Sequence, residues 1–279
     1  MTLPLPWPFD REYMQLALLA GLVVGTCAPL IGTFLVQKRL SLLGDGIGHI
    51  AFAGVAVGIA TGVWPVWTAM AAAVTGALAI EWLRGRGRTA GDLALALFFY
   101  SGIAGGIVVM SSAGSLDASA MGYLFGQILV VSPGDAWTIV AIGAAVTVTL
   151  LVTWRALLSI VIDEEAARVG GLPVDRLNLL LAALVAVTVV AGMRVVGVLL
   201  VAALMVLPVG TAQRLAPSFR LTLVAASATG AGSVVLGLAA ARLWDLAAGG
   251  TIVLVAAAAF ALSSLVGRRP GPALGAGTR

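Results

Sequence analysis

Charged residues are scarce in this 279-residue chain. Asp, Glu, Lys and Arg make up 10% of it, against about 25% in an ordinary soluble domain. Hydrophobic residues make up 61%, and the mean hydropathy is +1.09. So few charges cannot coat a water-exposed surface of this size, which excludes a soluble globular domain. The chain is long enough for about nine helical membrane spans of about 20 residues each.

Cysteine and histidine each occur once, as Cys27 and His49. A single cysteine excludes an intramolecular disulfide and a cage of cysteine ligands around a metal. Several catalytic motifs are also missing. The chain has no GxxxxGK[ST] phosphate loop, so we expect it not to hydrolyse ATP itself, and it has neither HExxH nor GxSxG. We therefore predict that it is not an enzyme.

Nine apolar stretches are near the length that a helix needs to cross the hydrocarbon core of a membrane. The predicted fold class is all-α: a polytopic transmembrane helical bundle. It has eight or nine spans, because the sixth stretch is short. The stretches are Met14–Val36, Gly46–Gly62, Trp64–Leu83, Leu93–Ser111, Asp135–Trp154, Leu177–Gly192, Val195–Gln213, Leu221–Ala241 and Thr251–Gly267.

The basic residues are unevenly distributed between the two sides of this bundle. One side carries thirteen Lys and Arg residues and the other carries three. By the positive-inside rule the richer side is cytoplasmic, which places the N-terminus outside and the C-terminus in the cytoplasm. The same distribution accounts for the net charge of +4 without a nucleic-acid partner. We predict an external segment over residues 1–13, a single membrane domain over 14–267 and a flexible cytoplasmic tail over 268–279. The richer links are Lys38–Asp45, Arg84–Asp92, Arg155–Arg176, Arg214–Arg220 and the tail from Arg268.

Asp45 and His49 are the ionisable residues that stand out at the start of the second stretch. An ionisable group at membrane depth is costly and is a functional candidate for that reason. Residues four apart lie on one face of a helix, so the two side chains can be aimed at one point. A carboxylate and a neutral imidazole suit a borderline divalent cation such as zinc or manganese. The glycines at 44, 46 and 48 would let the backbone open or approach another helix closely.

Two structural roles compete with metal or proton handling by this pair. Asp45 could cap the N-terminus of its helix, and His49 could be an interfacial residue bonded to a carbonyl. Two ligands also do not complete a metal site. The others would have to come from another helix, a second subunit, water or a passing substrate.

Asp163–Pro173 (DEEAARVGGLP) is the largest polar insert on the predicted cytoplasmic side. Asp163 suits an N-cap, and two glutamates suit the first helical turn that follows it. Gly170 and Gly171 would stop the helix before Pro173. We therefore expect a short helix at the cytoplasmic face. It is either a solvated loop helix with no partner or a docking helix for a cytoplasmic protein.

Four stretches in order carry a resemblance to a known family. They are Leu40–His49 (LSLLGDGIGH) running on to Ala53–Gly58, Tyr123–Leu129 with Val131–Pro133, Asp163–Gly171 followed by Pro173, and Val196–Pro208. Together they resemble the ZnuB-like permeases, which are the membrane subunits of zinc, manganese and iron ABC importers. The likeness runs from about residue 14 to 267. One position departs from the family pattern: Gly48 stands where the family commonly has Ser, which removes a possible hydroxyl contact.

This resemblance implies an assembly and a role for each motif. The assembly is a permease homodimer with a cytoplasmic ABC ATPase and an external metal-binding protein, in the bacterial cell (inner) membrane. The resemblance implies that Asp45 and His49 line the translocation path and that the insert transmits the motion of the ATPase. The residues of this coupling segment are Asp163, Glu164, Glu165, Arg168, Gly170 and Gly171.

The function expected from the sequence is therefore ATP-driven import of a divalent metal ion: zinc, manganese or iron. The metal would be the transported substrate, and no permanently bound cofactor is expected. Two alternatives stay open. The chain could be a self-sufficient ion-coupled secondary transporter, or an intramembrane enzyme that uses Asp45 and His49 as acid and base.

Overall fold

The computed structural model of the protein describes residues 6–85, 91–114, 122–124, 126, 132–193 and 195–266. Over these residues every regular element is helical and none is a strand, so the all-α prediction is confirmed. The predicted tail, 268–279, lies outside them. The helices are α1 (Glu12–Gln37), α2 (Leu43–Thr61), α3 (Pro65–Gly85), α4 (Gly91–Ser112), α6 (Pro133–Ile162), α7 (Glu164–Val169), α8 (Val174–Gly192), α9 (Val198–Leu215), α10 (Phe219–Trp244) and α11 (Ala248–Val266).

Eight of the described helices are long and apolar enough to cross a membrane. The apolar stretch described in α9, Leu200–Leu215, is shorter. The sequence predicted a span from Val195, but the chain first makes a turn in which Gly197 has a φ of 95°. Because an L side chain rarely adopts that conformation, glycine permits the turn, and α9 begins only at Val198.

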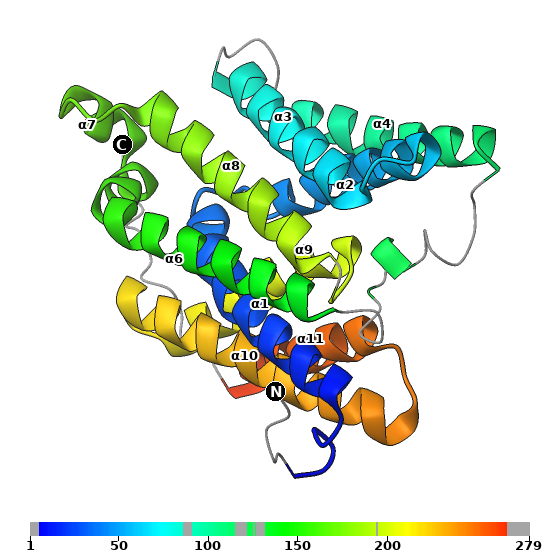
Figure 1. Ribbon diagram of the computed structural model, residues 1–279. Helices are drawn as coiled ribbons and strands as arrows, with labels where there is room; N and C mark the ends of the chain where they lie inside the picture. Colours follow the sequence, from blue (N-terminus) through cyan, green and yellow to red (C-terminus); the bar gives the residue numbers. More distant parts are fainter. Residues whose placement is uncertain are drawn as a thin grey trace.

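The fifth predicted span is longer in the structure than its apolar stretch. The prediction ended it at Trp154 and assigned Arg155–Arg176 to a polar link, whereas α6 continues to Ile162. No glycine or proline follows Arg155 within this helix, so nothing in the sequence breaks it there. Asp163 ends α6 in an extended conformation. The polar link is therefore shorter than expected, and α7 lies at the edge of the molecule (Figure 1).

α8 lies between two groups of helices (Figure 1). On one side α2, α3 and α4 pack against one another, and on the other side α1, α9, α10 and α11 do so. α2 also contacts α9. Gly44, in the first turn of α2, faces Ala202 and Met205 of α9. The beginning of α2 therefore lies where the two groups meet.

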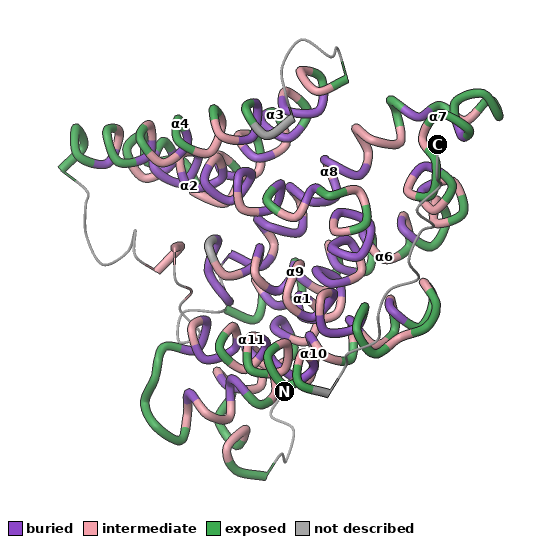
Figure 2. The backbone as a smooth tube through the Cα atoms, turned by 180° about the vertical axis from the view of Figure 1, so that it is seen from behind, coloured by how far each residue is buried: buried purple, intermediate pink, exposed green. Residues whose placement is uncertain are grey.

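α1 and α2 are the most deeply buried of the candidate spans. Of their most apolar windows 67% is buried, against 28% for α3, α4 and α6. The outward faces are apolar too: Trp67, Leu97, Val152 and Leu254 are all exposed. Figure 2 shows the buried positions on the inward helix faces and the exposed ones on the outward faces. Exposing so much apolar surface to water is unfavourable, whereas the same surface is compatible with the hydrocarbon core of a lipid bilayer.

Two glycines bring α1 into backbone contact with its neighbours. A Cβ at Gly32 would lie 1.8 Å from the carbonyl oxygen of Met205 in α9. A Cβ at Gly230 of α10 would lie 2.1 Å from the carbonyl oxygen of Gly25. Any side chain at these positions would push the helices apart. Close packing of this kind stabilises helix pairs in lipid, where the hydrophobic effect does not drive them together.

Candidate functional site

α2 carries Asp45 and His49 in its first two turns. Nε2 of His49 lies 3.7 Å from Oδ1 of Asp45, so the spacing of four places both side chains on one face. This distance is longer than a hydrogen bond. Two ligands that each lie about 2.0–2.1 Å from a tetrahedral metal are roughly 3.3 Å apart. A small movement of either side chain would therefore let both bind one ion.

Among the described residues, Asp45 does not act as the N-cap, and His49 shows no hydrogen bond to a carbonyl. The N-cap of α2 is Leu42, which makes no side-chain capping bond, and Asp45 lies inside the first turn. In the described part of the chain the polar contact of His49 is with Asp45 rather than with a carbonyl. The Asp45 carboxylate still benefits from its position near the positive end of the helix dipole.

A cavity of about 230 Å³ opens beside Asp45, between α2 and α4. The Asp45 side chain is 34% exposed, whereas that of His49 is 11% exposed. The rings of His49 and Phe99 are packed edge to face, with centroids 4.3 Å apart. An ion entering the cavity would therefore meet the carboxylate before the imidazole. The lining residues are Leu42, Asp45, Gly46, Leu95, Ala96, Phe99 and Tyr100.

As a metal site the pair would be incomplete. Over the described residues no group of three or more His, Cys, Asp or Glu side chains could hold an ion. Zinc usually takes four ligands and manganese more. One copy of the chain therefore offers two protein ligands at this place, and the remaining positions are open to other donors.

α7 is a short helix with a defined start and end, as the insert predicted. Oδ1 of Asp163 accepts the N–H of Ala166 at 2.9 Å, which caps the helix. At the other end Gly171 has a φ of 83°, and the N–H of Leu172 donates to the carbonyl of Ala167 at 3.1 Å. Ala167 is buried. The capping and this burial fix α7 in place at the end of α6.

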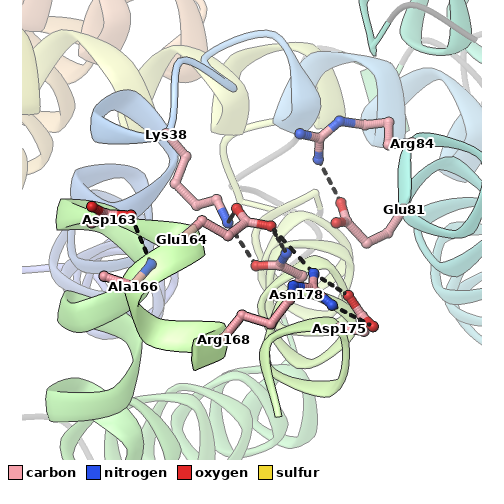
Figure 3. A network of polar contacts seen from close by, with 9 residues as sticks. All are labelled: Lys38, Glu81, Arg84, Asp163, Glu164, Ala166, Arg168, Asp175 and Asn178. Atoms are coloured by element: carbon pink, nitrogen blue, oxygen red, sulfur yellow. Dashed lines mark hydrogen bonds and ion pairs between the residues drawn. The ribbon is translucent and has the colours of Figure 1, made fainter. Parts of the chain in front are cut away.

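The two glutamates of α7 differ in their surroundings. Oε2 of Glu164 lies 3.1 Å from Nζ of Lys38, and Oε1 accepts the amide N–H of Asn178 at 3.3 Å. Figure 3 shows Glu164 turned toward these two residues. Glu165, in contrast, is exposed. Glu165 is therefore the more accessible of the two to a docking partner, since the Glu164 side chain is 43% exposed and bound to its neighbours.

Arg168 holds the far end of α7. Its guanidinium donates two hydrogen bonds to Asp175 of α8, at 2.7 and 3.2 Å (Figure 3). The hydrogen bond and the charge of Asp175 raise the pKa of Arg168, so this group stays cationic. The pair is exposed to solvent, and exposed ion pairs contribute little to stability. Arg168 also lies 3.9 Å from Oε1 of Glu164.

Three of the links predicted to be cytoplasmic meet beside α7. A cavity of about 410 Å³ lies between the end of α3 and the beginning of α8, and it is lined by both charges of the Glu81–Arg84 pair and by Glu164. Lys38 reaches Glu164 from the end of α1. These links therefore lie on one side of the bundle, as the charge distribution required.

Comparison with known proteins agrees with this arrangement of spans and polar segments. The profile of the ABC 3 transport family matches residues 10–267. The chain belongs to the ABC 3 transport family. The resemblance to ZnuB-like permeases that the sequence motifs suggested is thereby confirmed.

Relatives of this ABC 3 family member are named for different metals. The manganese transport system membrane protein MntC of Halalkalibacterium halodurans is 32% identical over 252 residues, 90% of this chain and 86% of the relative. The high-affinity zinc uptake system membrane protein ZnuB of Haemophilus influenzae is 30% identical over 255 residues, 90% of this chain and 97% of the relative. The solved structure of PsaBC from Streptococcus pneumoniae in complex with Fab has a TM-score of 0.82 and 31% identity, covering 93% of both chains.

The family motifs fall on different parts of this structure. Leu40–His49 forms the turn before α2 and the first two turns of α2. Val196–Pro208 forms the turn before α9 and the first part of α9. Of Tyr123–Leu129, only residues 123, 124 and 126 are described. The remainder of that motif, and residue 131 after it, lie outside the described residues.

Sequence reasoning missed three residues that shape these sites. Lys38 was interpreted only as one of the charges that set the topology, and Asn178 and Phe99 were not singled out. Phe99 and Asn178 carry no signal, because an aromatic or an amide in an apolar helix usually packs or bonds locally. Lys38 does carry one, since it is the only lysine in a chain with fifteen arginines.

Proposed function

We propose that this protein is the membrane-spanning permease subunit of an ATP-driven importer of divalent metal ions: zinc, manganese or iron. The observation that carries the proposal is the Asp45–His49 pair on one face of α2, beside a cavity. Charged residues are rare in this chain, so an ionisable pair within a span is a functional candidate. A carboxylate and an imidazole 3.7 Å apart are suited to binding a divalent metal ion. The metal ion is the transported substrate, and Asp45 and His49 line its path through the membrane.

A second copy of the chain completes the path in this proposal. One copy offers two ligands, and the cavity beside Asp45 opens along α4. The neighbouring outward residues of α4, Leu93, Leu97 and Tyr100, are exposed and apolar or aromatic. A homodimer across this face would bring two Asp45–His49 pairs toward a common axis, because a two-fold interface contacts itself.

The energy source is a separate ABC ATPase that docks on α7. The chain has no phosphate loop, and α7 presents Glu165 and Val169 outward, with Val169 91% exposed. The positive-inside rule puts α7 in the cytoplasm, the N-terminus outside and the C-terminus inside, in the inner membrane of a bacterial cell. An external metal-binding protein would deliver the ion to the opposite side.

Metal uptake by proteoliposomes that hold the permease, its ATPase and its binding protein tests this function. Zinc and manganese are supplied separately. Asp45→Ala and His49→Ala should each lower ATP-dependent uptake by about tenfold or more, because loss of even outer-shell groups costs roughly 10–100-fold. The matched control is Asp245→Asn, which removes an exposed carboxylate in the α10–α11 turn and should leave uptake unchanged.

The same assay separates the alternatives. Uptake that proceeds without the ATPase would identify a secondary transporter. Normal uptake by both variants, once each is shown to be inserted and folded, would refute the assignment of the path to Asp45 and His49. Turnover of a lipid or peptide by the permease alone would favour an intramembrane enzyme.

A further inference from the structure

The only lysine of the chain is buried against the coupling segment. The Lys38 side chain is 8% exposed. Its Nζ donates to Oε2 of Glu164 at 3.1 Å and to Oδ1 of Asn178 at 2.6 Å. Burying an ammonium group is costly unless partners satisfy it. The Lys38 ammonium therefore depends on both Glu164 and Asn178 as hydrogen-bond partners.

This contact joins three segments that are far apart in the sequence. Lys38 caps the end of α1, Glu164 opens α7, and Asn178 lies in the first turns of α8. Asn178 also donates to the other carboxylate oxygen of Glu164, at 3.3 Å. Figure 3 shows the three side chains converging. A displacement of α7 therefore pulls on the end of α1 as well as on its neighbour α8.

The end of α1 is connected to Asp45 by a short, hydrogen-bonded turn. Four residues, 39–42, lie between Lys38 and Leu43, where α2 starts. The N–H of Leu40 donates to the carbonyl of Leu35 at 2.8 Å, and the N–H of Leu43 donates to the carbonyl of Leu40 at 2.9 Å. Leu40 is also buried. Because the turn is short, hydrogen-bonded and anchored by buried Leu40, a displacement of Lys38 also displaces the first turn of α2, where Asp45 lies.

We propose that Lys38 is a positioning residue that mechanically links the ATPase-facing helix α7 to the metal-path residue Asp45. The inference rests on the proposed function and adds a specific route to it. The route is physically contiguous: Glu164, Lys38, the turn 38–42, then Asp45. The Arg168–Asp175 pair, in contrast, joins α7 to α8 without contacting Lys38.

The test compares metal transported with ATP hydrolysed in the reconstituted complex, with manganese and zinc each supplied. Lys38→Met and Glu164→Gln should each lower the ratio of metal to ATP by at least about fivefold, the range of a typical coupling between sites. Assembly with the ATPase should persist, because the outward face of α7 is unchanged. The double variant should be no worse than either single one. The swap Lys38→Glu with Glu164→Lys should restore part of the ratio.

Asp175→Asn is the matched control. It breaks the exposed Arg168–Asp175 pair between α7 and α8 without touching α1, and it should leave the ratio within about twofold of wild type. If the wild-type complex transports metal and Glu164→Gln keeps a normal ratio of metal to ATP, the link is refuted while the function stands. The link is also refuted if the double variant lowers this ratio by the product of the two single effects. If the wild-type complex moves no metal, the proposed function itself fails. A Lys38→Met chain that does not insert leaves Glu164→Gln to decide the matter.

Discussion

Position 48 precedes His49 in α2 but does not share its surroundings. A Cβ at Gly48 would lie 3.2 Å from the carbonyl oxygen of Val198 in α9 and 3.9 Å from the side chain of Val189 in α8. The cavity beside Asp45, in contrast, lies between α2 and α4. A serine at this position, which the family resemblance suggests, would thus place its hydroxyl near a backbone carbonyl. The missing hydroxyl contact noted in the sequence is therefore a helix-packing contact.

Gly48→Ser should consequently leave metal transport nearly intact. The new hydroxyl can donate to the Val198 carbonyl, and the tight contact costs no more than about 1 kcal/mol. We expect the KM and the rate for manganese and for zinc to stay within about twofold of wild type in the reconstituted complex. A change in preference between the two metals would contradict this orientation of position 48. Gly48→Ala serves as the control, because it has the same Cβ without the donor.

Contacts within one helix could be predicted from the sequence, whereas contacts between distant residues could not. The spacing of Asp45 and His49 predicts their shared face, because helix geometry is local. The Lys38–Glu164 contact joins residues 126 positions apart, and no local pattern encodes it. The aromatic wall that Phe99 forms against His49 likewise depends on how α4 packs on α2. Predicting such contacts requires tertiary packing that a single sequence does not supply.

At the scale of elements, α7 is a helix too short to be stable alone. It has six residues, whereas isolated helices shorter than about 12 residues are marginal in water. Its stability must come from its caps, from the burial of Ala167 against Ile160 and Val174, and from the contacts of Glu164. The sequence predicted the caps, since Asp163 and the glycine pair are local signals, but it missed the length of α6 that positions them.

Removing the N-cap of α7 should therefore weaken ATPase docking more than it affects the bundle. Asp163→Ala costs about 1 kcal/mol of helix stability, which corresponds to about fivefold in affinity if docking requires the folded helix. We expect this loss in the binding of the purified ATPase to the permease, together with faster amide exchange over 164–169. The thermal stability of the spans should not change.

Asp163→Asn is the control for that experiment, because an asparagine side chain can accept the same N–H bond from Ala166. It should restore both the affinity and the exchange protection. Faster exchange over α7 with unchanged ATPase affinity would show that α7 is a solvated loop helix with no docking role.

At the scale of the whole molecule, the charge distribution and the packing describe the same sidedness. The ends of α1, α3 and α6 and the start of α8 converge on the network around Glu164 (Figure 3), as a bundle of alternating spans requires. The sequence could predict this relative arrangement because apolar length and basic links are summed over many residues. It predicts the absolute orientation only through the positive-inside rule, since packing is the same whichever side faces the cytoplasm.

Cysteine labelling in right-side-out vesicles tests that orientation directly. The native Cys27 is buried in the bundle, so labelling should report the introduced positions. Val63→Cys, in the exposed turn between α2 and α3, should react with a membrane-impermeant maleimide added outside. Val169→Cys, on the outward face of α7, should react only after the vesicles are opened. Since both side chains are exposed in the structure, access to the reagent depends on the side of the membrane. The reverse labelling pattern would show that the bundle has the opposite orientation, with α7 outside the cell and inaccessible to a cytoplasmic ATPase.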